Sequence, residues 1–100
     1  MTRVVVTEAA ARSLAALIVS HSLPPDTAAR IRRTLALLEQ FPRLGPVVHS
    51  AMPEVRFLLG PWRWLVIVYT YRETDELVAI LAFEDGRSAN SATLGREQRP

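Results

Sequence analysis

Four arginines in the second half of the chain are the side chains whose type and spacing best suit chemistry. Each guanidinium is a planar, permanently charged fork that binds one phosphate or carboxylate through two parallel hydrogen bonds. The four are Arg56, Arg63, Arg72 and Arg87. The alternative is that they form surface ion pairs with the nearby glutamates Glu54, Glu73 and Glu84. The residue types alone leave both interpretations open.

Acid–base chemistry beside these arginines has few candidates. All 12 basic side chains are arginines, so the chain has no lysine for a Schiff base or a titrating general base. The nearby side chains that could accept a proton are Glu54, Glu84 and His49. An enzyme would have to combine Arg63 and Arg87 with one of these three groups.

The sequence predicts neither a metal site nor a bound cofactor. The two histidines, His21 and His49, are far apart in the chain, and no cysteine accompanies them. The 4 glycines are isolated, which excludes a glycine-rich phosphate loop and a nucleophile elbow. We interpret His21 as a partly buried packing residue on a helix and His49 as a loop residue at the surface.

The two tryptophans have two competing interpretations. Trp62 and Trp64 are two residues apart, so their side chains point to the same face of the sheet if their strand is regular. Core packing is expected for at least one of them. Trp62 follows the turn at Gly60 and Pro61, where it could instead anchor a partner protein, because aromatic residues are over-represented at such contacts.

The composition is that of one small folded domain. The chain has 100 residues, 49% of them hydrophobic, no cysteine and a formal charge of +2, which excludes a disordered chain and a disulfide scaffold. The longest apolar run, 77–83, is too short to span a membrane, and no signal-peptide pattern is present, so we expect a cytoplasmic protein. Residues 1–87 are predicted to form the domain, and 88–100 a tail that is mobile in the free protein.

Two helices are predicted in the first half, after a short β-branched strand over 3–6. Thr7 can cap a helix over 8–21, and Asp26 can cap a second helix that ends near residue 40 or 41 before Pro42. The apolar faces of the two helices follow the helical period. Their members are Ala10, Leu14, Leu17, Ile18 and His21 in the first helix, and Ala28, Ile31, Leu35 and Leu38 in the second.

Three strands are predicted in the second half, over 54–59, 62–71 and 77–83. The middle one is apolar on both faces, which places it in the interior of the sheet. The turn at Gly60 and Pro61 puts Arg56 and Arg63 on adjacent strands, and 72–76 is a charged hairpin loop. The order β-α-α-β-β-β predicts an α+β fold, with an N-terminal helical hairpin packed on a largely antiparallel sheet.

Four segments in this order resemble the RelE/ParE superfamily of toxins. They are a helix end with Pro-x-x-Gly at 42–45, a strand with Val-Arg at 55–56, a long strand that reaches Tyr69, and a hydrophobic strand that ends at Gly86 and Arg87. The predicted order of elements matches the family as well. The resemblance covers residues 3–87.

The resemblance implies the toxin of a type II toxin–antitoxin pair, neutralised by a cognate antitoxin protein that docks between the helices and the sheet edge. RelE-like members cut mRNA on the ribosome, and ParE-like members inhibit DNA gyrase. Cleavage of RNA needs a base, cations on the phosphate and an acid for the leaving oxygen. The family's nucleases use lysines and a C-terminal tyrosine or histidine, which this chain lacks.

We therefore expect a ParE-like, non-enzymatic inhibitor of DNA gyrase that meets DNA only through its antitoxin. By this interpretation the target-binding residues are Arg56, Arg63, Arg87 and Trp62. The alternative is a ribosome-dependent mRNA endoribonuclease. Its catalytic residues would be Arg63 and Arg87, with Glu54, Glu84 or His49 as the base.

Overall fold

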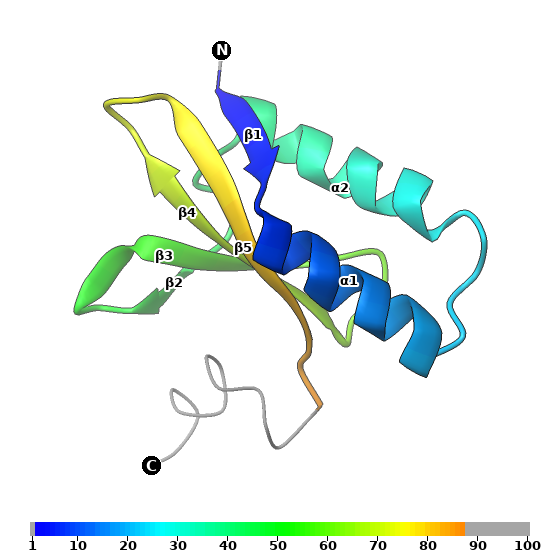
Figure 1. Ribbon diagram of the computed structural model, residues 1–100. Helices are drawn as coiled ribbons and strands as arrows, with labels where there is room; N and C mark the ends of the chain where they lie inside the picture. Colours follow the sequence, from blue (N-terminus) through cyan, green and yellow to red (C-terminus); the bar gives the residue numbers. More distant parts are fainter. Residues whose placement is uncertain (1, 88–100) are drawn as a thin grey trace.

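The computed structural model describes residues 2–87 and shows two helices packed on one face of a five-stranded sheet (Figure 1). The elements are β1 (Arg3–Val6), α1 (Glu8–Ser20), α2 (Thr27–Gln40), β2 (Val47–His49), β3 (Met52–Leu59), β4 (Leu65–Arg72) and β5 (Leu77–Asp85). The predicted α+β fold, with its helical hairpin, is confirmed. The predicted tail, 88–100, lies outside the described residues. Neither described helix has the length and apolar character that a membrane span requires.

The strands follow the order β1-β5-β4-β3-β2, and only the β1–β5 pair is parallel. Strand β2 was not predicted, because three residues are too few to show a period; Val47 pairs with Arg56, and His49 with Met52. The prediction that β4 begins at Trp62 is wrong. Residues 60–64 form a tight connection, closed by hydrogen bonds from the Gly60 amide to the Leu65 carbonyl and from the Leu65 amide to the Trp62 carbonyl.

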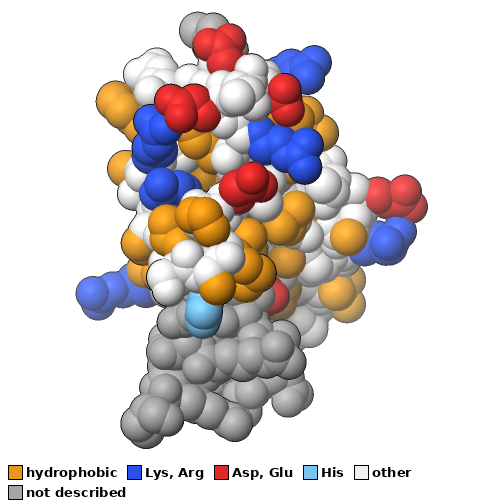
Figure 2. Space-filling view, turned by 90° about the vertical axis from the view of Figure 1, so that its left-hand side faces the viewer, with side chains coloured by type: hydrophobic (Ala, Val, Ile, Leu, Met, Phe, Trp, Pro, Cys, Tyr) orange, Lys and Arg blue, Asp and Glu red, His pale blue; other side chains and the backbone are white. Residues whose placement is uncertain are grey.

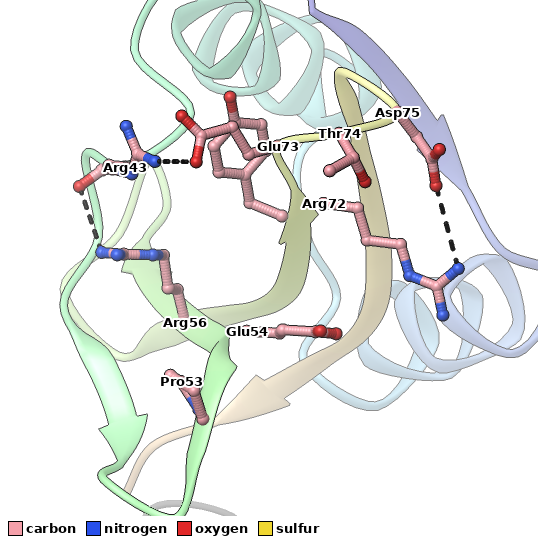
Figure 3. A pocket seen from close by; sticks show the side chains of 9 residues that line it. Arg43, Pro53, Glu54, Arg56, Arg72, Glu73, Thr74 and Asp75 are labelled. Atoms are coloured by element: carbon pink, nitrogen blue, oxygen red, sulfur yellow. Dashed lines mark hydrogen bonds and ion pairs between the residues drawn. The ribbon is translucent and has the colours of Figure 1, made fainter.

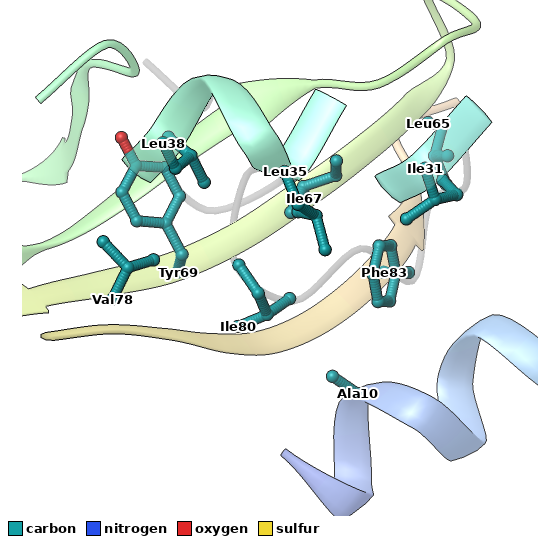
Figure 4. Close-up of a cluster of buried hydrophobic side chains, with 10 residues drawn as sticks. All are labelled: Ala10, Ile31, Leu35, Leu38, Leu65, Ile67, Tyr69, Val78, Ile80 and Phe83. Carbon is teal, nitrogen blue, oxygen red and sulfur yellow. The ribbon is translucent and has the colours of Figure 1, made fainter. Parts of the chain in front are cut away.

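The helices cover the sheet with the apolar faces that the sequence predicts, apart from one residue. The Thr7 hydroxyl caps α1 by accepting a hydrogen bond from the Ala10 amide, and it donates to the Ile80 carbonyl of β5. In α2, Thr27 is buried in place of the expected Ala28, because its hydroxyl donates to the Pro24 carbonyl at the start of the helix. Figure 4 shows the resulting core between helices and sheet, which contains Ala10, Ile31, Leu35, Leu38, Leu65, Ile67, Tyr69, Val78, Ile80 and Phe83.

A β-bulge in β5 explains how both halves of that strand reach this core. The register with β4 shifts so that Tyr69 pairs with Ile80 while Val68 pairs with Ala82, which leaves Leu81 as an extra residue. One extra residue reverses the alternation of side chains, so Ile80 and Phe83 both face the helices. The opposite face of the sheet holds a second, smaller cluster of Val48, Val66 and Val68, with Val55, Phe57 and Ala82 around it.

Candidate functional site

An open pocket of about 520 Å³ lies where the start of β3 and the end of β4 meet two loops (Figure 3). One loop is 41–46, which follows α2, and the other is the hairpin turn between β4 and β5. We call this hollow the Arg56 pocket. Its lining residues are Arg43, Pro53, Glu54, Arg56, Tyr71, Arg72, Glu73, Thr74 and Asp75.

The 41–46 loop forms a fixed wall of the pocket, because hydrogen bonds tie it to two strands. The buried Tyr69 hydroxyl donates to the Pro42 carbonyl at 2.9 Å and accepts from the Gly45 amide at 3.0 Å. The Phe57 amide donates to the Pro46 carbonyl at 3.1 Å. Burial raises the pKa of Tyr69, so the neutral phenol that can both donate and accept is the form that the fold favours.

We expect Tyr69→Phe to lower the free energy of unfolding by about 1–3 kcal/mol, because the change removes a buried hydroxyl and leaves the Gly45 amide without its partner. Urea unfolding checks this value. Tyr71→Phe is a matched control, because Tyr71 is only partly buried and its hydroxyl forms no hydrogen bond within residues 2–87. Equal midpoints for Tyr69→Phe and the unaltered protein would contradict the role given to this hydroxyl.

An ion pair joins the two loops across the pocket. An Arg43 guanidinium nitrogen lies 2.7 Å from a Glu73 carboxylate oxygen, and both side chains are largely exposed. Glu73 raises the pKa of Arg43. The same guanidinium lies over the ring of Tyr71, 5.4 Å from its centroid, which adds a cation–π contact.

Glu54 and Arg56 face the pocket from the same side of β3, because they are two residues apart in one strand. Arg56 donates to the Gly45 carbonyl at 2.8 Å and to the Arg43 carbonyl at 3.4 Å, so neutral oxygens orient its charge. Within residues 2–87, neither Glu54 nor Arg56 forms an ion pair. The sequence left open that the arginines form surface ion pairs with Glu54, and no such pair is present within the described residues.

A second cluster lies at the opposite end of the sheet, around Asp85 at the end of β5. Arg87 donates from its side chain to both carboxylate oxygens, at 3.1 and 3.0 Å, and from its amide at 2.9 Å. His21, just after α1, lies 2.9 Å from the same carboxylate through Nε2. Arg87 first, and His21 second, hold the pKa of Asp85 well below its usual range.

Four stacked side chains extend this cluster over the 60–64 connection. The His21 ring stacks on Trp64 with centroids 4.7 Å apart, and Trp64 stacks on Trp62 at 5.9 Å. The guanidinium of Arg30 in α2 lies over the Trp62 ring, 5.8 Å from its centroid, and that of Arg87 lies 5.1 Å from the centroid of the Trp64 ring. His21 is thus the packing residue that the sequence predicts. Trp62 is half-buried between its neighbours and packs against the core, so only part of it is open to a target.

The Asp85 cluster predicts a loss of stability in acid. Because the pKa of Asp85 is lower in the folded than in the unfolded chain, the unfolded state takes up the proton more readily. The stabilisation from this carboxylate is present above about pH 4 and is lost as the pH falls below that value. We expect Asp85→Asn to flatten the fall of the urea midpoint between about pH 5 and pH 2. Parallel curves for the two proteins would exclude this contribution.

The residues predicted from the sequence fall into separate places. Glu54 and Arg56 line the Arg56 pocket, and Arg87 belongs to the Asp85 cluster. Arg63 is exposed in the 60–64 connection, so the expectation that it lies on a strand is wrong. Glu84 is paired with Val66 on the face of the sheet without helices. His49 is exposed, as expected, but the interpretation as a loop residue is wrong: it lies in β2, where its Nδ1 accepts a hydrogen bond from the Ala51 amide at 3.0 Å.

The structure separates two of the three proposed bases, Glu54 and His49, from Arg87. Val55 beside Glu54 is paired with Thr70, while Asp85 is paired with Leu65, so five residues of β4 separate the two ends. At a rise of about 3.4 Å per residue, that separation is roughly 17 Å. Glu84 alone among the three bases lies at the same end as Arg87.

Sequence reasoning missed Arg43, Tyr71 and Asp85, and it named Glu73 only as an ion-pair partner for the other arginines. Arg43 and Glu73 lie in different loops, and no local pattern tells that the loops meet. Tyr71 could have been found, because it is two residues after Tyr69 in β4 and its side chain therefore lies on the same face of the sheet. Within residues 2–87, no group of three or more His, Asp or Glu side chains could hold a metal ion. No protein-family model matches the chain, and neither does any curated protein.

Proposed function

We propose that the chain is the toxin of a type II toxin–antitoxin pair, which arrests growth by binding a protein target and is neutralised by a cognate antitoxin. The resemblance to ParE-like toxins makes DNA gyrase the proposed target. The proposal includes a location in the cytoplasm, where gyrase and the antitoxin are found. The target-binding residues in this proposal are Arg56, Arg63, Arg87 and Trp62.

The observation that carries the non-enzymatic form of this proposal is the separation of two of the three candidate bases from Arg87. Glu54 and His49 lie far along the sheet from Arg87, and proton transfer needs contact or a single intervening water. Arg87 is held by Asp85 in the two-pronged geometry that an external carboxylate would use.

The charge distribution also favours a protein over a nucleic acid as the direct target. Figure 2 shows basic and acidic side chains interspersed with hydrophobic ones over the face in view, with no broad basic stripe. A surface that binds a nucleic-acid backbone gathers its cations on one face or along one helix. The formal charge of only +2 agrees with this pattern.

A strip of exposed hydrophobic side chains is the proposed docking surface for the antitoxin. It runs from the end of α2 through the 41–46 loop to the edge strand β2 and consists of Leu37, Phe41, Leu44 and Val47. A hollow of about 310 Å³ lies within it, lined by Phe41, Pro42, Arg43 and Leu44. An antitoxin segment with alternating apolar and acidic residues would fill this strip and meet Arg43. Opposite charges would speed association and make its rate depend on salt.

A triple variant separates the proposed toxin from the alternative endoribonuclease. We expect Glu54→Gln, Glu84→Gln and His49→Asn together to leave growth inhibition largely intact in cells that lack the antitoxin. A nuclease would lose roughly 10²–10⁴-fold in rate on removal of its general base. The measurement is colony formation on induction of each variant.

Expression level and folding of the triple variant are checked first by immunoblot and circular dichroism. A variant with Glu39→Gln and Glu8→Gln, both at exposed positions, serves as a control for changes of the same chemical kind elsewhere on the chain. Loss of toxicity in a folded, soluble triple variant would favour the ribosome-dependent endoribonuclease, with Glu84 as the first base to examine because it lies nearest to Arg87 along the sheet.

A further inference from the structure

We propose that the Arg56 pocket binds a small zwitterion of amino-acid size, with its carboxylate on Arg56 and its ammonium group on Glu54. The site shares Arg56 with the proposed target-binding residues, but the binding test below requires no toxin activity. It follows from three features of the pocket: fixed walls, a balanced set of charges, and two opposite charges on one strand that have no ion-pair partner within the described residues.

The pocket is built on rigid elements. Its floor is formed by β3 and β4, and the 41–46 loop is held by both hydrogen bonds of the Tyr69 hydroxyl. A Cβ atom at Gly45 would lie 1.9 Å from the Phe57 carbonyl oxygen, which shows how closely the loop packs on β3. A preformed site of this kind loses little conformational entropy when a ligand binds.

The balance of charges favours a neutral, dipolar ligand over a simple ion. Three guanidinium groups and three carboxylates line the pocket. A phosphate would meet the repulsion of Glu54, Glu73 and Asp75, and a bare cation would meet that of the arginines. A zwitterion avoids both forms of repulsion, because each of its ends can face the opposite charge.

Glu54 and Arg56 supply those two opposite charges. They are two residues apart on one side of β3, so their Cα atoms are separated by about 6.5–7 Å. Arg43 and Arg72 each have a carboxylate neighbour, at 2.7 Å from Glu73 and 4.0 Å from Asp75. The charges of Glu54 and Arg56 are thus the two left for a ligand, and Figure 3 shows Glu54 extending into the hollow from β3.

The size and the apolar parts of the pocket set the class of ligand. Its volume of about 520 Å³ lies in the range of small-molecule sites, which is about 300–1,000 Å³. Tyr71 and Pro53 provide apolar surface beside the charged pair. A free amino acid with an apolar or aromatic side chain matches these features.

Three matched probes test the proposal by titration of the ¹⁵N-labelled full chain, followed through amide chemical shifts. L-Phenylalanine carries both charges, phenethylamine lacks the carboxylate, and 3-phenylpropionate lacks the amine. We expect phenylalanine to bind about 10-fold more tightly than either half-ligand, because each charged hydrogen bond that is lost costs about that factor. The shifts should be confined to amides around the pocket.

Variants assign each charge to its residue. Glu54→Gln should weaken phenylalanine and phenethylamine about 10-fold and leave 3-phenylpropionate unchanged. Arg56→Gln should weaken phenylalanine and 3-phenylpropionate about 10-fold and leave phenethylamine unchanged. Glu39→Gln, on the exposed side of α2, should leave the affinity for all three probes unchanged. Unfolding curves verify that each variant is folded. Equal affinity for the three probes, unaltered affinity of Glu54→Gln for phenylalanine, or no shifts at about 10 mM probe would each overturn the proposal.

Discussion

Gly45→Ala is expected to lower the free energy of unfolding by at least about 3 kcal/mol, beyond the usual 1–3 kcal/mol for an overpacked site. The added Cβ would lie 1.9 Å from the Phe57 carbonyl oxygen and 2.8 Å from its carbon. Both are backbone atoms of β3, so a change of rotamer gives no relief. The loop must move away, which weakens the hydrogen bond from the Gly45 amide to the Tyr69 hydroxyl and the one from Arg56 to the Gly45 carbonyl.

Urea unfolding followed by tryptophan fluorescence measures this loss. Gly60→Ala is the matched control, because the nearest atom to its added Cβ is the end of the flexible Leu65 side chain at 3.0 Å. We expect a clearly smaller loss there. A Gly45→Ala protein as stable as the Gly60→Ala protein would show that the 41–46 loop is not closely packed on β3.

Leu35→Ala is expected to cost about 2–5 kcal/mol, the range for removing a large aliphatic side chain from a core. Leu35 is 8% exposed and packs between α2 and the sheet, next to Ile31 and Leu38 (Figure 4). Its loss leaves a cavity between α2 and the sheet. The urea midpoint should fall accordingly, and Leu37→Ala, at a side chain 48% exposed, should change it little. An unaltered midpoint for Leu35→Ala would mean that the face of α2 that carries Leu35 is not buried against the sheet.

The helices and the long strands could be predicted because their signals are local. Thr7 caps α1 as expected, and the period of Ile31, Leu35 and Leu38 identifies the buried face of α2. Asp26 shows the limit of such a signal. It occupies the cap position of α2, but its carboxylate pairs with Arg30 at 2.9 Å instead of accepting a backbone hydrogen bond.

The features that could not be predicted depend on long-range packing. The bulge at Leu81 arises from the register between β4 and β5, and no pattern within β5 reveals it. Strand β2 exists only through its pairing with β3. Trp62 and Trp64 have strand-like composition, yet stacking between His21 and Arg30 holds them in a turn.

The candidate site was predicted in part for the same reason. Arg56 and Glu54 were identified by residue type, and their common pocket follows from the alternation of β3. The contacts that surround them come from loops distant in the chain, such as Arg43 with Glu73. His21 and Asp85 are 64 positions apart, so nothing local could pair them.

The most direct test of the proposed function is supercoiling by purified DNA gyrase in the presence of the purified chain, with primer extension on translated mRNA beside it. We expect inhibited supercoiling and intact message, and we expect inhibition to weaken in Arg63→Ala, whose exposed side chain can be removed without disturbing the core. Unaffected gyrase together with cleavage at codon-aligned sites would contradict the proposal and establish the endoribonuclease. If neither gyrase inhibition nor mRNA cleavage is observed, the chain has this fold but no toxic activity against either target. That result would contradict the proposal as well.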